Sequence, residues 1–238
     1  MRTPTSSASV LARAARTTKA FTDRFPWVGP TVFVSSSLYF VVQLVVAWVW
    51  HPAYSLVTNT ISDLGNTRCG PYRGAYVCSP RHDLMNAGFI FLGLVMAVGS
   101  LLMCQEFTEQ GGRQRLAARV GFSLLALAGA GSIVVGLFPE NTVRVAHVVG
   151  AGLAIGVGNL AIGILWLALP LPAGVRSLMA FIGTVSIVAL VLFASHRDLG
   201  IGAGGMERVA AYPQTVWLIR FGAYQFRPHG RLTRVAAR

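Results

Sequence analysis

The sequence predicts an all-α membrane protein, a polytopic bundle of six transmembrane helices with both termini in the cytoplasm. Charged residues make up only 12% of its 238 residues, whereas soluble domains carry about 25%. Five stretches of 19 to 24 residues contain no Asp, Glu, Lys or Arg, and about 20 apolar residues suffice to cross a bilayer core. The predicted spans are residues 27–50, 84–104, 120–138, 148–169, 177–195 and 210–226.

The sixth predicted span is the least regular. It has 17 residues and contains Pro213 and Arg220. A proline removes a helical hydrogen bond, and an arginine in a span needs a polar partner or must reach the membrane interface. We expect Arg220 to extend to the inner membrane surface.

The basic residues predict the orientation of the chain. With the N-terminus in the cytoplasm, fourteen of the twenty Lys and Arg residues lie inside and six outside, which fits the positive-inside rule. We therefore predict a disordered basic cytoplasmic tail over residues 1–26, a second basic cytoplasmic tail over 227–238, and a location in the plasma membrane. The net charge of +12 reflects this topology, so no nucleic-acid partner is expected.

The three cysteines divide between the two sides of the membrane. Cys69 and Cys78 lie nine positions apart in the first outer loop, and Cys104 lies at the inner end of the second span. Cysteines on the oxidising side commonly pair, which predicts a disulfide between the first two. Two free thiols or a metal-binding pair are the alternatives. Cys104 is expected to pack as a small apolar side chain.

Small residues form a face on two of the spans. Small residues at positions i and i+4 allow membrane helices to approach closely, so we expect both faces to be buried. They could pack within the bundle, in a homo-oligomer or against a membrane-protein partner. The residues are Gly152, Gly156, Asn159 and Gly163 on the fourth span, and Ala128, Ser132 and Gly136 on the third.

Polar side chains gather at the predicted outer ends of the spans, and we call this set the outer crown. It draws on the first outer loop, the segments that flank the middle spans, and the segment before the sixth span. We expect it to bind a lipid or a small polar ligand. Helix capping and ion pairing at helix ends are the structural alternative. The crown residues are Asn59, Ser62, Asp63, Asp83, Asn86, Glu140, His147, Glu207 and Arg208.

A zinc site is a second interpretation of the same region. His82, His147 and His196 lie near the ends of three different spans, and zinc needs three or four N, O or S ligands. Asp63 or Asp83 could then act as a base toward a zinc-bound water. No His-x-x-x-His or Cys-x-x-Cys pair supports the site, so the main expectation is that the protein has no cofactor, with zinc as the alternative.

Four short motifs carry a family resemblance. They are Asn59-Thr-Ile-Ser-Asp-Leu-Gly65, Asp83-Leu-Met-Asn86, Gly136-Leu-Phe-Pro-Glu140 with His147 after it, and Gly205-Met-Glu-Arg208. Together they resemble the DUF998 family of bacterial and archaeal six-span membrane proteins of unknown function, over about residues 30–225. More distantly, the first motif is similar to the DRAM/Frag/Sfk group. The resemblance implies six spans, adds Gly65 and Pro139 to the candidate signature, and supplies no catalytic residue.

Three functions are compatible with these patterns. The first is a non-enzymatic protein that binds or organises lipid, or a small polar ligand, at the crown. The second is a membrane-embedded, metal-dependent hydrolase of a lipid or amide. The third is a small transporter, which is disfavoured because the chain has no evident inverted repeat and no charge at mid-membrane.

Overall fold

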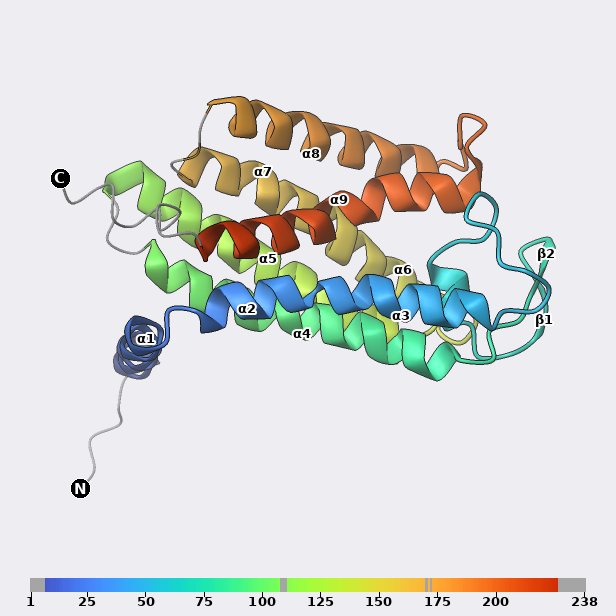
Figure 1. The fold of residues 1–238 in the computed structure, drawn as a ribbon, viewed down its shortest axis with the longest axis horizontal. Helices are drawn as coiled ribbons and strands as arrows, with labels where there is room; N and C mark the ends of the chain where they lie inside the picture. Colours follow the sequence, from blue (N-terminus) through green and yellow to red (C-terminus); the bar gives the residue numbers. More distant parts are fainter. Residues whose placement is uncertain (1–6, 108–110, 170, 172, 227–238) are drawn as a thin grey trace, which may run out of the picture.

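The chain folds as a bundle of long antiparallel helices with a small β-hairpin at one end (Figure 1). The structure, a computed structural model, describes residues 7–107, 111–169, 171 and 173–226. The elements are α1 (Ser7–Arg24), α2 (Val28–Ser35), α3 (Ser37–Trp48), the 3₁₀-helix η1 (Ser62–Gly65), β1 (Gly70–Tyr72), β2 (Ala75–Val77), α4 (His82–Glu106), α5 (Gly112–Leu137), α6 (Arg144–Ala151), the π-helical η2 (Gly152–Val157), α7 (Gly158–Ala168), α8 (Ala173–Ala194) and α9 (Gly202–Gln225).

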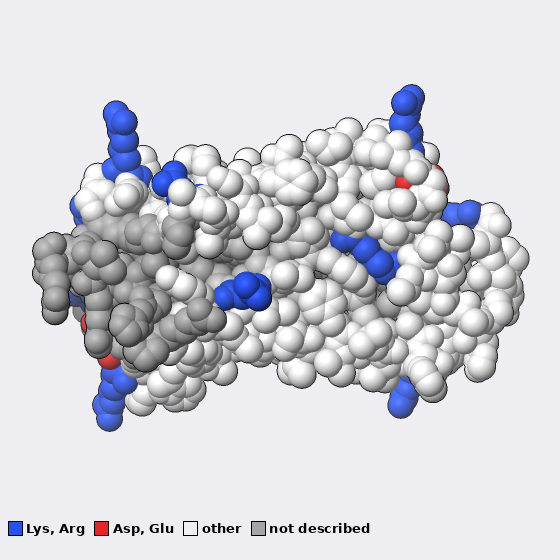
Figure 2. Space-filling view, turned by 45° about the horizontal axis from the view of Figure 1, so that its top comes forward, with Lys and Arg blue, Asp and Glu red and all other residues white. Residues whose placement is uncertain are grey.

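Five helical segments among the described residues are long and apolar enough to cross a membrane. They are Val28–Trp48, His82–Glu106, Gly112–Leu137, Arg144–Ala168 and Ala173–Ala194. Each contains most of one predicted span, so the prediction of an all-α polytopic membrane bundle is confirmed at this level. Figure 2 shows most of the visible Lys and Arg toward the two ends of one face, with two basic groups nearer its middle and white surface between them.

The first of these segments is interrupted at Ser36, where α2 meets α3. The hydroxyls of Ser35 and Ser36 each donate to the carbonyl three residues earlier, at 2.6 Å. Such bonds compete with the helical hydrogen bonds of the backbone. Before the interruption α2 packs on both α4 and α9, and after it α3 continues along α4.

The α4–α5 pair forms the centre of the bundle. The backbones approach closely at Gly93 and Gly129, where a Cβ on Gly129 would lie 2.5 Å from the Gly93 carbonyl oxygen. The Ser132 hydroxyl donates to the Phe89 carbonyl across the same seam at 2.8 Å. The predicted small-residue face of the third span is buried here, since Ala128, Ser132 and Gly136 are all buried.

The prediction that the glycine face of the fourth span is buried as one continuous face is wrong. Gly152 is exposed, and nothing lies within 4 Å of a Cβ built on Gly152 or Gly163. The cause is η2, because a π-helical turn takes one extra residue and rotates the following helix by about 100° relative to an α-helix. Asn159 is buried as expected, and its amide donates to the Ala210 carbonyl of α9 at 3.0 Å.

The described chain enters and leaves the bundle at the same end, which we call the tail end (Figure 1). Residues 1–26 were expected to be disordered, but Ser7–Arg24 form α1, which packs against α4. The tail predicted over residues 227–238 lies outside the described residues. The predicted sixth span corresponds to α9, which starts eight residues earlier than expected and contains Pro213.

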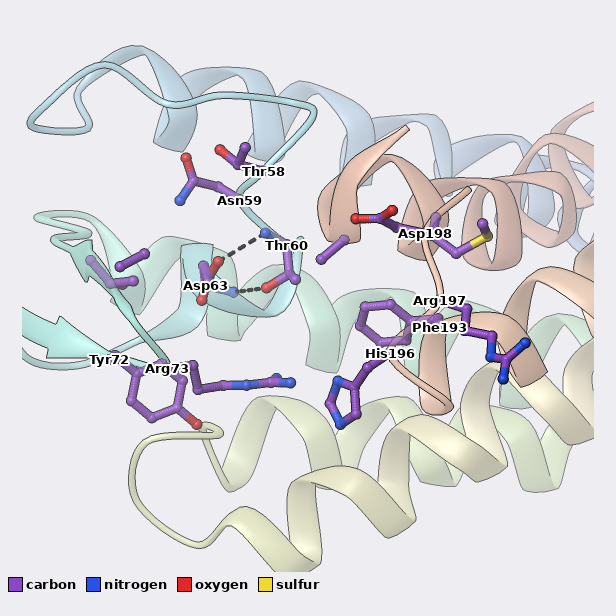
Figure 3. A pocket seen from close by; sticks show the side chains of 14 residues that line it. Thr58, Asn59, Thr60, Asp63, Tyr72, Arg73, Phe193, His196, Arg197 and Asp198 are labelled. Carbon is purple, nitrogen blue, oxygen red and sulfur yellow. Dashed lines mark hydrogen bonds between the residues drawn. The ribbon is translucent and has the colours of Figure 1, made fainter. Parts of the chain in front are cut away.

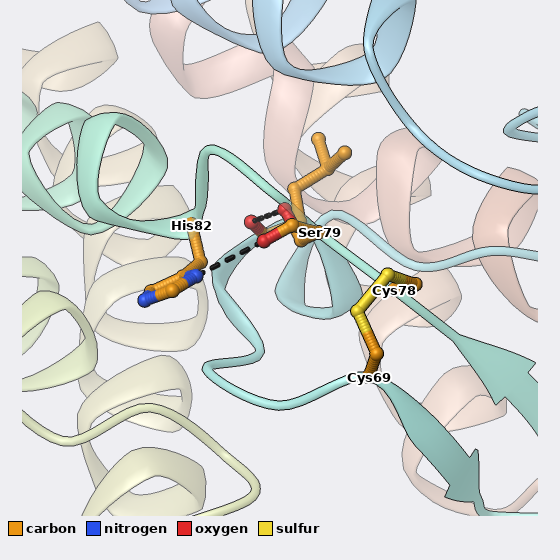
Figure 4. The surroundings of a disulfide bond; sticks show 5 residues. Cys69, Cys78, Ser79 and His82 are labelled. Carbon is orange, nitrogen blue, oxygen red and sulfur yellow. Dashed lines mark hydrogen bonds between the residues drawn. A yellow bond between two sulfur atoms is a disulfide. The ribbon is translucent and has the colours of Figure 1, made fainter.

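The opposite end carries β1 and β2, and we call it the hairpin end. The strands pair antiparallel with Pro71 opposite Tyr76, and the predicted Cys69–Cys78 disulfide closes the hairpin (Figure 4). Just after it, the buried Ser79 hydroxyl donates to the Leu64 carbonyl at 2.6 Å. The hairpin is thereby fixed to η1, which carries the crown residues Ser62 and Asp63.

Candidate functional site

Arg208 holds the loop that leads from α3 to η1. Its guanidinium is buried and donates to the carbonyls of Leu56 and Asn59 at 3.0 and 2.9 Å, and to the Tyr54 hydroxyl. Its Nε donates to the Tyr212 hydroxyl at 3.2 Å. Several fixed donors on one planar group suit this role, which a lysine cannot reproduce.

Ser62, His147 and Glu207 meet directly beneath this loop. The Ser62 Oγ lies 3.0 Å from His147 Nε2 and donates to Glu207 Oε1 at 3.0 Å. His147 Nδ1 lies 3.0 Å from the Phe138 carbonyl oxygen, and Glu207 Oε2 accepts the backbone N–H of Ile61. Three segments far apart in the sequence therefore converge on one serine hydroxyl.

Asp63 and Glu140 form a buried pair of acids beside this cluster. Asp63 accepts the Thr60 backbone N–H at 2.8 Å, and Glu140 lies 3.7 Å from the Arg73 guanidinium. Burial, together with the neighbouring Asp63 carboxylate, raises the pKa of Glu140 to about 8. Glu140 therefore keeps its proton near neutral pH, where an ordinary carboxyl group has lost it.

The remaining crown residues separate into two groups. Asn86 donates to the Gly65 carbonyl at 3.0 Å, and Asn59 accepts the Ser55 backbone N–H at 2.9 Å. Asp83 is exposed in the first turn of α4 and makes no side-chain hydrogen bond to the described residues. The structure therefore brings eight crown residues into one connected region and leaves Asp83 outside it.

A pocket of about 250 Å³ opens beside the crown at the hairpin end. It lies between the α3–η1 loop, the hairpin and the α8–α9 turn. Figure 3 shows the side chains of Arg73 and His196 extending toward each other across it, with Asp63 and Thr60 on a neighbouring wall. Phe193 and Met206 supply apolar surface on the α8–α9 side.

Two of the three basic residues that line this pocket, Arg73 and His196, occupy left-handed backbone positions, and the third is Arg197. Arg73 has φ 50° in the hairpin turn before Gly74, and His196 has φ 57° at the end of α8. The backbone bonds from His196 to Phe193 and from Arg197 to Leu192 close α8 with the pattern that usually places glycine at position 196. A left-handed non-glycine residue is strained, and strained residues often mark functional sites.

The three histidines of the zinc interpretation are not brought together. His147 is buried with Ser62, His82 Nδ1 lies 3.0 Å from the Ser79 carbonyl oxygen, and His196 is exposed in the pocket. Among the described residues, no group of three or more His, Cys, Asp or Glu side chains could hold a metal ion.

Sequence reasoning missed several residues of the site. Tyr54 and Tyr212 complete the Arg208 hydrogen bonds, and Tyr212 donates onward to Gln43 at 2.9 Å. Arg73 was counted only as an outside charge. Its position before Gly74 was the available signal, since two-residue hairpin turns favour Asn-Gly or Asp-Gly and an arginine there is unusual.

The comparisons agree with the resemblance carried by the motifs. The family described as "Protein of unknown function (DUF998)" matches residues 33–224, which include all the crown and pocket residues. Neither a curated protein nor a solved structure matches the chain. With most of its length covered, from the last turn of α2 to the last turn of α9, the chain belongs to the DUF998 family.

Proposed function

We propose that this protein is a six-span plasma-membrane protein that binds the polar head group of a lipid in its hairpin-end pocket. The anionic part of the head group lies between Arg73 and His196. The acyl chains run along α8, next to the apolar wall that Phe193 and Met206 provide.

Support for a sixth crossing comes from α9 itself. Its 24 residues are long enough to span a bilayer core, and its polar side chains Glu207, Arg208 and Gln214 are covered by neighbouring elements. An even number of crossings places both tails on one side, where the positive-inside rule puts the cytoplasm.

The observation that carries the ligand proposal is the pair of strained basic residues. Arg73 and His196 come from separate loops, each at a position where glycine or asparagine would relieve the backbone, and both side chains enter the same pocket (Figure 3). Phosphate is the usual anionic partner of arginine. The outer surface of α8 favours a lipid over a soluble ligand, because only 22% of the residues in its apolar stretch are buried inside the protein.

The test uses substitutions that remove the ligand contacts and, of the structural bonds, only the 3.7 Å ion pair between the exposed Arg73 guanidinium and Glu140. We expect Arg73→Asn with His196→Gly to keep or raise the thermal unfolding midpoint, because both changes relieve left-handed strain. After detergent washing, the amount of phospholipid that co-purifies with the double variant should be at least about tenfold lower than with wild type, measured by mass spectrometry. A tenfold loss corresponds to about 1.4 kcal/mol of binding free energy.

Leu199→Gly is the matched control. Leu199 has φ 51° in the same α8–α9 turn but does not line the pocket, so the control should gain stability and keep its lipid. Equal lipid in the double variant and the control would refute the proposal. Displacement of the bound lipid by soluble glycerol phosphate would also contradict it, since the ligand would then be a small anion.

A further inference from the structure

Ser62 has an environment that differs from those of the other bundle serines. Ser36 and Ser132, for example, donate to backbone carbonyls, as structural serines in membrane helices commonly do. The Ser62 hydroxyl instead contacts an imidazole nitrogen and a carboxylate oxygen, each at 3.0 Å. A serine paired with a histidine is the arrangement that activates a hydroxyl as a nucleophile.

The hydrogen bonds fix which nitrogen of His147 faces Ser62 as an acceptor. The Phe138 carbonyl oxygen can only accept, so Nδ1, 3.0 Å away, must carry the proton. In the neutral ring, Nε2 therefore presents its lone pair to the Ser62 Oγ. This is the tautomer in which a histidine can take a proton from a serine, with a carbonyl orienting the ring.

Glu207 competes for the single proton of Ser62. As a carboxylate it accepts that proton at Oε1; as a protonated acid it donates to the Ser62 Oγ, and the serine proton turns to His147. Its Oε2 accepts the Ile61 N–H in either state. The protonation state of Glu207 thus decides whether the Ser62 hydroxyl proton faces the carboxylate or the histidine.

A cavity of about 50 Å³ lies next to Ser62 and Glu207 inside the bundle. Its other walls are mostly apolar and include Phe89, Leu92 and Val135. At its far side, the buried Oε1 of Gln214 has no hydrogen-bond partner among the described residues. Such an atom calls for a polar group in the cavity. The wall that η2 and α9 contribute includes the small side chains of Ala154 and Ala211 beside Ile155.

We propose that Ser62 and His147 form a metal-free nucleophile and base that accept an acyl group from an ester or amide. The Ser62 Oγ bonds to the acyl carbon while its proton passes to His147 Nε2. The bond to the leaving group breaks, and that group takes the proton. Water then adds to the acyl carbon, gives a proton through Nε2 to the departing Ser62 oxygen, and releases the acid. The first carbons of the acyl group occupy the apolar cavity, and a longer chain leaves between Ala154 and Ala211.

A fluorophosphonate with a short alkyl chain tests this directly on the folded wild-type protein in detergent. Attack by the Ser62 oxygen forms an O–P bond and expels fluoride, with the proton taken by His147. We expect one adduct per chain, located on the peptide that contains Ser62, and none on heat-denatured protein. Absence of an adduct on folded wild type, or an adduct on another residue, overturns the proposal.

Three variants distinguish a nucleophile from a structural hydroxyl. His147→Gln retains hydrogen-bonding groups but cannot act as the base, so labelling should slow by at least about 100-fold. Ser100→Ala removes a buried serine that lines neither this cavity nor the hairpin-end pocket and should leave labelling unchanged. Glu207→Gln should keep or accelerate labelling, because the amide cannot hold the serine proton in place of His147.

Two outcomes contradict the assigned roles. Equal labelling of wild type and folded His147→Gln would show that His147 is not the base. Loss of labelling in Glu207→Gln, with His147→Gln unaffected, would assign the base to Glu207 instead. Because the first readout is made on wild type, a failure of the His147 variant to fold leaves the proposal falsifiable, and the lipid-retention experiment on Arg73 and His196 is independent of it.

Discussion

Glu207 and Arg208 show at the scale of single residues why adjacent opposite charges need not pair. Glu207 binds the Ile61 N–H and the Ser62 hydroxyl, whereas Arg208 binds carbonyls of the preceding loop and two tyrosine hydroxyls. Consecutive residues on a helix point about 100° apart. The pair therefore fixes two successive parts of one loop, and η1 is held in the place where Ser62 can meet His147.

Glu140 provides a pH-dependent prediction. Its pKa is about 8 in the folded protein against 4.5 for the free side chain, so the folded state binds the proton more tightly. The resulting stability is complete below about pH 4.5 and is lost as the pH rises through 8. We expect the thermal unfolding midpoint of the wild type to fall as the pH rises from about 5 to about 9. Glu140→Gln should make this decrease with pH smaller.

The charged groups near Glu140 define the control for this measurement. Asp63 and Glu207 raise its pKa, and Arg73 lowers it. Asp83→Asn removes an exposed carboxylate from the same end of the bundle and should retain the wild-type slope. An unfolding midpoint that rises with pH, or identical slopes for wild type and Glu140→Gln, would show that Glu140 is ionised in the folded protein.

The crown residues could be predicted from their residue types and positions, but their contacts could not. Polar residues at span ends already suggested Ser62, His147 and Glu207. The contacts depend on the Phe138 carbonyl and the Ile61 N–H, which every sequence supplies at every position. Backbone groups become specific only through the fold, so no residue pattern could show that Ser62, rather than a metal, would face His147.

The α4–α5 pair gives the corresponding lesson for whole elements. Apolar length predicted each span, and α-helical spacing predicted the small face of α5. The same rule failed on the fourth span because η2 changes the helical period between Gly152 and Asn159. A π-helical turn has no reliable local sequence signal, so the face after it could not be predicted from spacing alone.

Gly129 is the element-scale test of the helix seam. A methyl group there would lie 2.5 Å from the Gly93 carbonyl oxygen and 2.9 Å from the Ala97 nitrogen. Both are backbone atoms, so the helices must move apart. We expect Gly129→Ala to destabilise the protein by about 1–3 kcal/mol, measured by unfolding in mixed detergent micelles.

Gly163→Ala is the control for this substitution. Nothing lies within 4 Å of the added methyl group, and alanine favours a helix interior over glycine by about 0.5–1 kcal/mol. The control should therefore be neutral or slightly stabilising. Equal stability of the two variants would mean that the α4 and α5 backbones are not in close contact at Gly129.

At the scale of the whole molecule, the bundle separates its two chemical surfaces. Large apolar side chains such as Leu44, Trp48 and Phe181 are exposed on the sides of the helices, as a lipid-facing surface requires. The described hydrogen bonds between distant segments concentrate at the hairpin end. The sides thus match a bilayer, while the hairpin end presents a pocket of about 250 Å³.

The number of crossings can be decided with single cysteines. In a Cys104→Ala background, the Cys69–Cys78 disulfide leaves no free thiol, so an introduced cysteine is the only target for a membrane-impermeant maleimide. Arg144→Cys lies at the hairpin end and should react on intact cells. Arg113→Cys and Phe226→Cys lie at the tail end and should react only after permeabilisation.

Phe226 is the decisive position because it follows the last residue of α9. With α9 as a sixth span, it stands on the same side as Arg113, and the polar residues Glu207 to Gln214 enter the membrane covered by the bundle. Reaction of Phe226→Cys on intact cells, together with a protected Arg113→Cys, would instead leave five crossings and place the end of α9 outside.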